Sequence, residues 1–320
     1  MKIRKSLYGL RQSPNVWNAT IDKDLRSMRF IPTVSDPSAY TNGSGKPYCI
    51  ITLFVDDLIC GPVNTVLDKV RSDLKAIFSM SDLGKVTQIL GIDINYNMQS
   101  GILKLSQGNY TNIMLKRFNM DNCNIVHTPG TGPELSSQPD GGILLGNKGT
   151  KEYQSIVGSL IFLTICTRYD IAFSTMQAAR HMSKLTAVHM GAIKRILRYL
   201  RGKPDLAIVY KRDSTFRLLA FCDASYGNGD PEKSSTGSMI FLSGGLVHFS
   251  SHLHKITAQS TSEAELVAMN TCAKHGVCLE EYLESWDGPI SAALRFTRTI
   301  AVRSSWQQLQ TSLPEASTSA

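Results

Sequence analysis

Short apolar runs and helical spacings alternate along the first part of the chain. Residues 17–28 and 63–78 repeat apolar positions at helical intervals, and Pro32 and Pro37 break the segment between them. Residues 48–60 read YCIITLFVDDLIC, with apolar and β-branched residues on both sides of two adjacent aspartates. This pattern predicts two buried strands joined by a tight turn at the aspartates.

The middle of the chain changes from strands to helices. Residues 90–96 and 103–105 flank Gly101 and predict a second hairpin. Residues 128–150 are rich in Pro, Gly and Ser, which is typical of a linker or a long surface loop. The following residues, 151–202, have an all-helical pattern.

The last predicted helix of that segment runs from about residue 188 to 201 and ends at Gly202 and Pro204. Its apolar stripe consists of Ile193, Ile196, Leu197 and Leu200. Its basic stripe consists of Lys194, Arg198 and Arg201. The basic stripe is a candidate nucleic-acid contact, and an ordinary solvated helix face explains it equally well.

Strand patterns return over residues 215–250. The segments FRLLAFCDAS, STGSMIFLSGG and LVHFSS predict three strands, and a helix over about residues 262–282 follows. The apolar residues on one face of that helix are Leu266, Met269, Ala273 and Val277. After Trp286 the pattern degrades, and residues 287–320, rich in Ser, Thr and Ala, are assigned to no fold.

The composition predicts a folded, basic protein with free thiols. The formal net charge of +8 favours a polyanionic partner, although an ordinary basic surface gives the same balance. The seven Cys form no CxxC pair, which is typical of a reducing compartment. No Cys completes a tetrahedral set with His248, His252 and His254, so no structural metal is expected there. The longest apolar run, residues 156–166, is shorter than the about 20 residues that span a bilayer, and no signal peptide is visible.

Asp56 and Asp57 form the first candidate site. Adjacent carboxylates beside buried strands repel each other and lose hydration, and a divalent cation removes both penalties. Mg²⁺ takes one or two carboxylates and keeps its other positions for water and phosphate oxygens. Two-metal nucleotidyl transfer uses this arrangement. A plain Asp-rich turn between two strands is the alternative explanation.

Two motifs lie in and before this hairpin: KSLYGLRQSPNVWN at residues 5–18 and FVDD at residues 54–57. They resemble the reverse transcriptase of copia-type LTR retrotransposons. That family has K-S-L-Y-G-L-[KR]-Q-x-P-x-x-W followed by Y-V-D-D, and here Phe54 replaces the Tyr. By this resemblance Asp56 and Asp57 are metal-site positions, and Asp56 is the better candidate for a direct ligand.

The resemblance extends to both sides of the Asp pair. It implies that Gly9, Gln12 and Pro14 belong to the segment that lines the nucleotide pocket and the template strand. The later segment SDLGKVTQILGIDI resembles the family's D-L-G-x-x-x-x-x-L-G-I. In structural terms, Gly84 and Gly91 are expected to be turn and bulge residues.

The second half of the chain resembles the connection segment and RNase H of the same family. TRYDIAF, MSKLTAVH and AIKRILRYLRG resemble T-R-P-D-I-A-F, M-x-x-P-T-x-x-H and A-x-K-R-I-L-R-Y-L-K-G. Tyr169 and Leu185 stand where the family has Pro. FCDASYGNGDPEKSSTGSMIFLSGG and QSTSEAELVA resemble the RNase H motifs S-D-A-D-x-A-x-D-x-x-x-R-x-S-T-S-G and S-S-T-E-A-E-Y-x-A. The resemblance implies that Asp223 and Glu265 are two of the carboxylates that hold two Mg²⁺ for RNA-strand hydrolysis.

Physical arguments bear on the same two residues. Asp223 ends an apolar strand that should be central, where a carboxylate is costly to bury unless it is hydrogen-bonded or holds a metal. Glu265 is expected in the first turn of a helix that could pack against that strand. Ser262 and Glu265 also fit S-x-x-E, so a helix cap is the alternative explanation for Glu265.

Two features of the family pattern are missing. The family's first catalytic Asp lies well upstream of the LYGL motif, and only five residues precede Ser6. The C-D-N-Q motif that would supply a third RNase H carboxylate does not follow the predicted helix, and Asp287 is no substitute. We expect a fragment that is truncated at both ends and inactive as an isolated chain. Completion in trans by an upstream polypeptide, or a non-catalytic nucleic-acid-binding protein, are the alternatives.

The resemblance implies an α/β (α+β) fold with a partial reverse transcriptase palm and thumb, a helical connection and a partial RNase H-like mixed sheet. The implied partial reverse transcriptase covers residues 1–127, and a linker covers residues 128–150. The implied connection covers residues 151–212, and the partial RNase H-like domain covers residues 213–286. Residues 287–320 form an unassigned tail. The implied cofactor is Mg²⁺ at two-metal sites. The implied partners are an RNA template, a DNA primer or RNA–DNA hybrid, dNTP and the rest of the Pol polyprotein, without a membrane. An intracellular location is implied, either in cytoplasmic virus-like particles or in the nucleus.

Overall fold

The computed structural model divides the chain into two compact units. One consists of residues 1–86 with 277–298, and the other of residues 87–276 with 299–320. The structure describes residues 11–43, 48–62, 65–130, 135–136, 143–212, 218–227 and 233–286, and the backbone of a strand at 301–304. Within these described ranges, no helix combines the length and the apolar character needed to cross a membrane.

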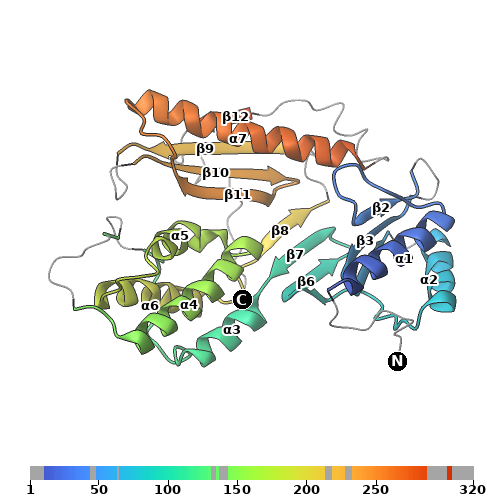
Figure 1. Ribbon diagram of the computed structural model, residues 1–320, viewed down its shortest axis with the longest axis horizontal. Helices are drawn as coiled ribbons and strands as arrows, with labels where there is room; N and C mark the ends of the chain where they lie inside the picture. Colours follow the sequence, from blue (N-terminus) through green and yellow to red (C-terminus); the bar gives the residue numbers. More distant parts are fainter. Residues whose placement is uncertain are drawn as a thin grey trace. The chain divides into compact units, whose positions relative to one another are not determined.

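The first unit contains a four-stranded antiparallel sheet, in the order β1-β2-β3-β4, and two helices (Figure 1). Its elements are α1 (Ser13–Ser27), β1 (Ile31–Pro32), β2 (Ala39–Thr41), β3 (Ile50–Phe54), β4 (Asp57–Gly61) and α2 (Thr65–Ile77). Pro14 stands in the first turn of α1, where its missing N–H leaves no hydrogen bond unmade. Ile21, Leu25 and Leu67 anchor the two helices in one core with β2 and β3. The predicted helices and the predicted Asp hairpin are confirmed.

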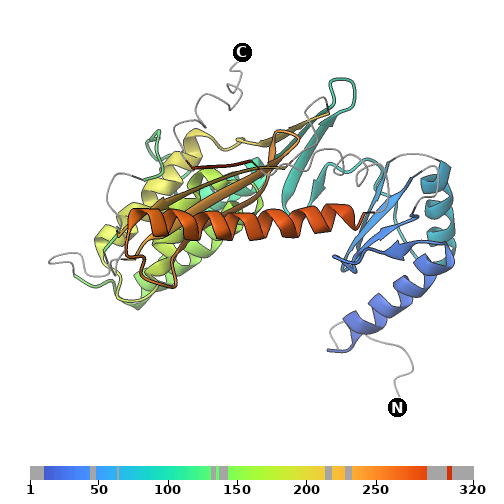
Figure 2. The same ribbon diagram turned by 90° about the horizontal axis from the view of Figure 1, so that it is seen from above.

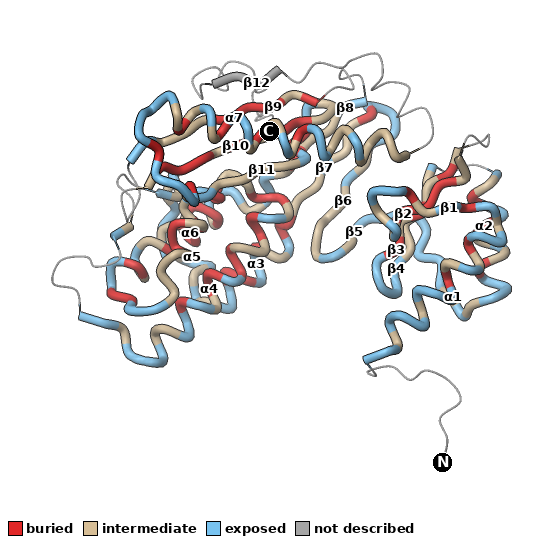
Figure 3. Tube along the Cα trace, turned by 45° about the horizontal axis from the view of Figure 1, so that its top comes forward, coloured by how far each residue is buried: buried red, intermediate tan, exposed pale blue. Residues whose placement is uncertain are grey.

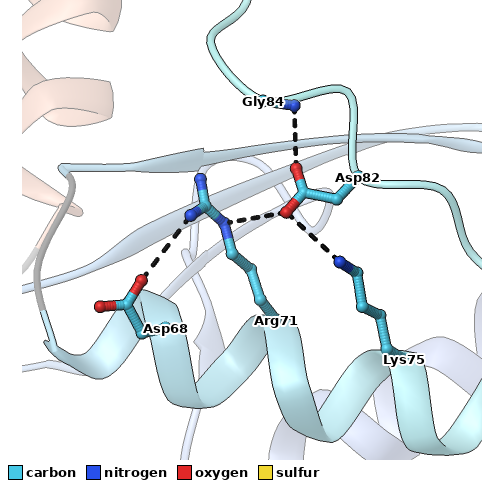
Figure 4. A network of polar contacts seen from close by, with 5 residues as sticks. All are labelled: Asp68, Arg71, Lys75, Asp82 and Gly84. Carbon is cyan, nitrogen blue, oxygen red and sulfur yellow. Dashed lines mark hydrogen bonds and ion pairs between the residues drawn. The ribbon is translucent and has the colours of Figure 1, made fainter.

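Asp82 organises the loop that follows α2. Its carboxylate accepts a hydrogen bond from the Gly84 N–H at 2.9 Å and pairs with Lys75 at 3.5 Å and Arg71 at 3.7 Å (Figure 4). Gly84 has φ +73°, in the left-handed region that favours glycine. The D-L-G segment is therefore a structural turn, and the role predicted for Gly84 is confirmed.

The second unit begins with an antiparallel sheet in the order β5-β6-β7-β8. Its strands are β5 (Gln88–Ile89), β6 (Ile92–Asn97), β7 (Ile102–Ser106) and β8 (Ile208–Lys211). Gly91 lies in the tight β5–β6 turn with φ +75°, and Gly101 lies in the β6–β7 turn with φ +65°. These positions confirm the second predicted hairpin.

A helical core follows this sheet. Its helices are α3 (Gly108–Arg117), α4 (Asn147–Cys166), the 3-10 turn η1 (Tyr169–Ile171), α5 (Ala172–Arg180) and α6 (Ala187–Gly202). The apolar stripe predicted for α6 is buried, as Figure 3 shows for the inner faces of α4 and α6. Met114 and Leu115 of α3 belong to the same core. Residues 87–127 therefore share a compact unit with the helices of residues 143–212, and the family boundary predicted at residue 127 stays a prediction.

The second unit also contains a mixed sheet in the order β11-β10-β9-β12. Its strands are β9 (Leu218–Ser225), β10 (Ser235–Leu242), β11 (Gly245–Leu253) and β12 (Ala301–Ser304). The first three confirm the predicted strands and are antiparallel, whereas β12 is parallel to β9. Residues 301–304 come from the tail that the sequence assigned to no fold, so that assignment was incomplete.

Helix α7 (Thr261–Glu284) lies along the sheet formed by β9, β10 and β11 (Figures 1 and 2). The buried residues of α7 are small: Ala264, Ala268, Cys272 and Gly276. The thiol of Cys272 lies 3.7 Å from the Phe221 carbonyl oxygen of β9, which fixes this side against the sheet. Leu266 is 64 % exposed, so the apolar face predicted for this helix is not its packing face.

Candidate active sites

Asp56 and Asp57 lie at the tip of the β3–β4 hairpin. Phe54 pairs with Asp57, which leaves Val55 and Asp56 as the two turn residues. Both carboxyl-bearing residues are exposed, so they are accessible to a ligand. The predicted tight turn is confirmed, but the flanking strands are less buried than predicted, because β3 buries alternate residues and β4 buries none fully.

The segment that resembles the LYGL motif reaches this turn through Trp17. Its indole Nε1 donates a hydrogen bond to the carbonyl oxygen of Val55 at 2.7 Å. Its rings pack edge-on against Phe78, with ring centroids 5.3 Å apart. The sequence analysis missed this role, although Trp17 is the last matched position of the motif.

The three residues predicted to line the nucleotide pocket belong to the same segment. Gln12 and Pro14 are exposed at the start of α1. Gly9 lies outside the described residues. Exposure alone does not define a binding surface, so the role of these residues stays a prediction.

Asp223 of β9 and Glu265 of α7 form a second carboxylate pair. Burial raises the pKa of both carboxyl groups, the charge of Asp223 raises the pKa of Glu265 further, and the Ala224 N–H lowers both. One oxygen of Glu265, Oε2, is buried without a hydrogen-bond partner. An unpartnered buried carboxylate oxygen close to a second carboxylate suits a hard cation such as Mg²⁺. The residues present therefore fit the metal that the family resemblance implies.

The cap at the start of α7 is made by other residues. The N–H of Glu263 donates to Ser260 Oγ at 3.1 Å, and Glu263 Oε2 accepts a hydrogen bond from the Gln259 N–H at 2.6 Å. The alternative explanation of Ser262 and Glu265 as a capping box is therefore wrong. Glu265 is the fifth residue of α7 rather than a first-turn residue, and it has no part in this cap.

Strand β12, which pairs with β9, supplies no third carboxylate. Ser304 of β12 pairs with Cys222, next to Asp223. Residues 288–314, which include β12, contain no Asp or Glu. In the described ranges, no group of three or more His, Cys, Asp or Glu is placed to hold a metal. Asp223 and Glu265 thus stand as a pair.

The basic stripe of α6 has a structural task. Arg198 Nε donates to the Asn124 carbonyl oxygen at 2.7 Å, and Arg201 Nε donates to the Asp121 carbonyl oxygen at 2.6 Å. Lys194 is exposed. Arg198 and Arg201 are therefore not merely a solvated face, because they fasten the loop after α3 to α6, and their predicted contact with nucleic acid stays a prediction.

Two of the three histidines considered for a metal, His248 and His254, contact neighbouring side chains. His248 Nε2 lies 3.1 Å from His275 Nδ1 of α7. His254 Nε2 lies 2.6 Å from Thr236 Oγ1, and His254 is buried. These contacts give His248 and His254 a place in the packing of the mixed sheet.

Comparison with known proteins agrees with the motifs. Residues 1–131 match the family described as reverse transcriptase (RNA-dependent DNA polymerase). The chain is 38 % identical, over 88 % of its length and 22 % of the relative's, to the retrovirus-related Pol polyprotein from transposon TNT 1-94 of Nicotiana tabacum. It is 36 % identical, over 82 % of its length and 18 % of the relative's, to the retrovirus-related Pol polyprotein from transposon RE1 of Arabidopsis thaliana. The chain thus spans 22 % and 18 % of these curated relatives.

A solved foamy viral protease-reverse transcriptase in complex with RNA/DNA hybrid aligns with 99 % of this chain and 40 % of that chain. The two structures align with a TM-score of 0.48 at 16 % sequence identity. Mixed helices and sheets, together with the match over residues 1–131, define a reverse transcriptase region. The chain belongs to the retrovirus-related Pol polyproteins of copia-type retrotransposons, which confirms the resemblance seen in its motifs.

Proposed function

We propose that this chain contributes part of an RNA-directed DNA polymerase and part of an RNase H to a longer Pol polyprotein. The observation that carries the proposal is the β3–β4 turn, which presents Asp56 and Asp57 side by side at an exposed tip. The indole of Trp17 connects this turn to the LYGL segment, so two sequence motifs converge on one place. Such convergence supports a site rather than an incidental Asp-rich turn.

Asp56 and Asp57 would hold Mg²⁺, with Asp56 as the better direct ligand. Their oxygen donors in an exposed turn suit an ion that binds few protein carboxylates and keeps water and phosphate oxygens. When bound, two such ions activate the attacking hydroxyl and stabilise the leaving oxygen of the phosphate. The task of this chain's own residues is to hold the carboxylates in place, through the hairpin register and the Trp17 bond.

Asp223 and Glu265 would hold the metal of the RNase H part. The buried, unpartnered Glu265 Oε2 supports this assignment. The absence of Asp and Glu from residues 288–314 supports a further proposal, that this pair does not hydrolyse an RNA strand in the isolated chain.

We also expect no polymerisation by the 320-residue chain alone. Two metal ions about 3.5–4 Å apart need carboxylates around both of them. Asp56 and Asp57 are neighbours on one hairpin and cannot surround such a pair by themselves. A polypeptide from the upstream part of the polyprotein would supply the further carboxylate and so complete the site.

The proposed ligands are an RNA template, a DNA primer or RNA–DNA hybrid, and dNTP. Gly9, Gln12 and Pro14 would line the nucleotide pocket, and Lys194 with the remaining donors of Arg198 and Arg201 would contact phosphates. A second candidate function is non-catalytic nucleic-acid binding, which the net charge of +8 favours.

Primer extension on an RNA template tests the polymerase proposal. The chain is joined to the upstream part of a related reverse transcriptase and compared with the same fusion carrying Asp56→Ala. Extension that depends on Asp56 supports the catalytic function, and nucleic-acid binding without extension in either protein favours the second candidate.

A further inference from the structure

One hydrogen bond links α1 to the turn that carries the aspartates. Trp17 Nε1 donates to the carbonyl oxygen of Val55 at 2.7 Å, and this carbonyl belongs to the peptide that joins Val55 to Asp56. From this geometry we infer that Trp17 is a positioning residue that fixes the direction of the Asp56 carboxylate. The inference rests on the metal role proposed above for the Asp pair.

Val55 gives the bond its importance. Its φ is +53°, in the left-handed region that a β-branched residue rarely adopts because Cβ crowds the backbone. Val55 is also 60 % exposed, so burial of its side chain does not explain why the turn keeps this conformation. Rotation about the N–Cα bond of Val55 toward an ordinary negative φ would carry this carbonyl away from the indole, so the hydrogen bond from Trp17 opposes that rotation.

Trp17 is itself held in place, as a positioning residue must be. Its rings meet the Phe78 ring edge-on, at 75° between planes and 5.3 Å between centroids. One turn further along α1, Ile21 is fully buried, as is Leu25 after it. The buried residues of α1 and the contact with Phe78 therefore hold the indole in place, with its N–H directed to the turn.

A simple tie between helix and hairpin is the competing explanation. In that case loss of the N–H would lower stability and leave the properties of the aspartates unchanged. The two explanations differ in how they treat Val55. If Trp17 acts by holding a left-handed Val55, then Val55→Gly should make the bond dispensable, since glycine adopts this conformation without help.

Mn²⁺ titration of the full 320-residue chain tests the inference. Mn²⁺ is the paramagnetic probe, and the amide NMR signals of residues 56–58 report its approach. Trp17→Phe keeps an aromatic ring for Phe78 and removes the N–H. Benzothienylalanine at position 17 keeps both rings without the N–H and replaces Trp17→Phe if that variant folds poorly. Trp286→Phe, which removes an indole N–H outside this turn, is the matched control.

We expect the Mn²⁺ concentration that halves the amide signals of residues 56–58 to rise about tenfold in Trp17→Phe. The same concentration should stay unchanged in Trp286→Phe. Adding Val55→Gly to Trp17→Phe should restore the original concentration. An unchanged response in Trp17→Phe, or a weakened one that Val55→Gly does not restore, overturns the inference alone. A wild-type chain whose signals ignore Mn²⁺ overturns the proposed metal role, and the inference with it.

Discussion

Asp170 accepts two parallel hydrogen bonds from the guanidinium group of Arg168, at 2.9 Å from Nε to Oδ1 and 2.8 Å from Nη2 to Oδ2. Arg168 is fully buried, and its Nη1 also donates to the Lys203 carbonyl oxygen after the end of α6, at 2.8 Å. The T-R-x-D motif at residues 167–170 thus fastens the end of α6 to the turn after α4. Its recurrence in the family pattern needs no catalytic explanation.

Asp170→Asn should lower the free energy of unfolding by about 3–5 kcal/mol, because it leaves the buried Arg168 charge without its counter-ion. Urea denaturation measures the change. Asp68→Asn, which removes an exposed partner of Arg71, is the matched control and should have a much smaller effect. Equal losses in the two variants would show that Arg168 and Asp170 do not form a buried ion pair in solution.

The carboxylates Asp223 and Glu265 should make the chain less stable as pH rises above about 4. Both pKa values are raised in the folded state, so the folded chain binds more protons than the unfolded chain between the unfolded and folded values. The double variant Asp223→Asn, Glu265→Gln should therefore gain stability relative to the wild type as pH rises above about 4. Denaturation curves at several pH values measure the difference.

Asp82 provides the control of opposite sign. The Gly84 N–H, followed by the charges of Arg71 and Lys75, lowers its pKa, so its contribution is present above the unfolded pKa and lost as pH falls. Asp82→Asn should thus lose stability relative to the wild type at neutral pH and less in acid. If the stability of both variants relative to the wild type changed with pH in the same direction, the assignment of raised pKa values to Asp223 and Glu265 would be contradicted.

The residues of the basic stripe of α6 should differ in their effect on stability, because Arg201 also holds the loop after α3 whereas Lys194 is exposed. Lys194→Ala should weaken duplex binding and reduce the slope of log affinity against log salt by about 0.9, with no loss of stability. Arg201→Ala should lower the free energy of unfolding by about 1.5–3 kcal/mol, because hydrogen bonds from a charged donor to two carbonyl oxygens are lost. Filter binding over a salt series, with thermal unfolding, separates the two. Binding that is insensitive to salt would leave Lys194 as solvated surface.

Local sequence pattern was enough for several elements and misleading for others. The β3–β4 hairpin and the stripe from Ile193 to Leu200 follow from strong periodicity, and both are present. Helix α7 reverses the expected face because small residues such as Ala264 and Ala268 allow close approach to the sheet, whereas the larger Leu266 remains exposed. Hydrophobicity alone cannot reveal a packing face chosen by size.

Contacts between segments that lie far apart in the sequence were not predicted. The four-residue strand β12 becomes a strand only by pairing with β9, so no local pattern marks it. Trp17 reads as an amphipathic helix residue until the carbonyl of Val55 is placed beside it. Similarly, the choice of Glu263 over Glu265 as the capping residue depends on where α7 begins.

The central claim is that Asp56 belongs to a polymerase metal site that this chain only partly supplies. Primer extension on an RNA template tests it with three proteins: the chain alone, its fusion to the upstream part of a related reverse transcriptase, and that fusion with Asp56→Ala. We expect extension from the fusion, none from the chain alone, and a loss of at least about 10²–10³-fold in the Asp56→Ala fusion. Extension by the chain alone would contradict the claim that its site is partial, and undiminished extension by the Asp56→Ala fusion would contradict the assignment of Asp56.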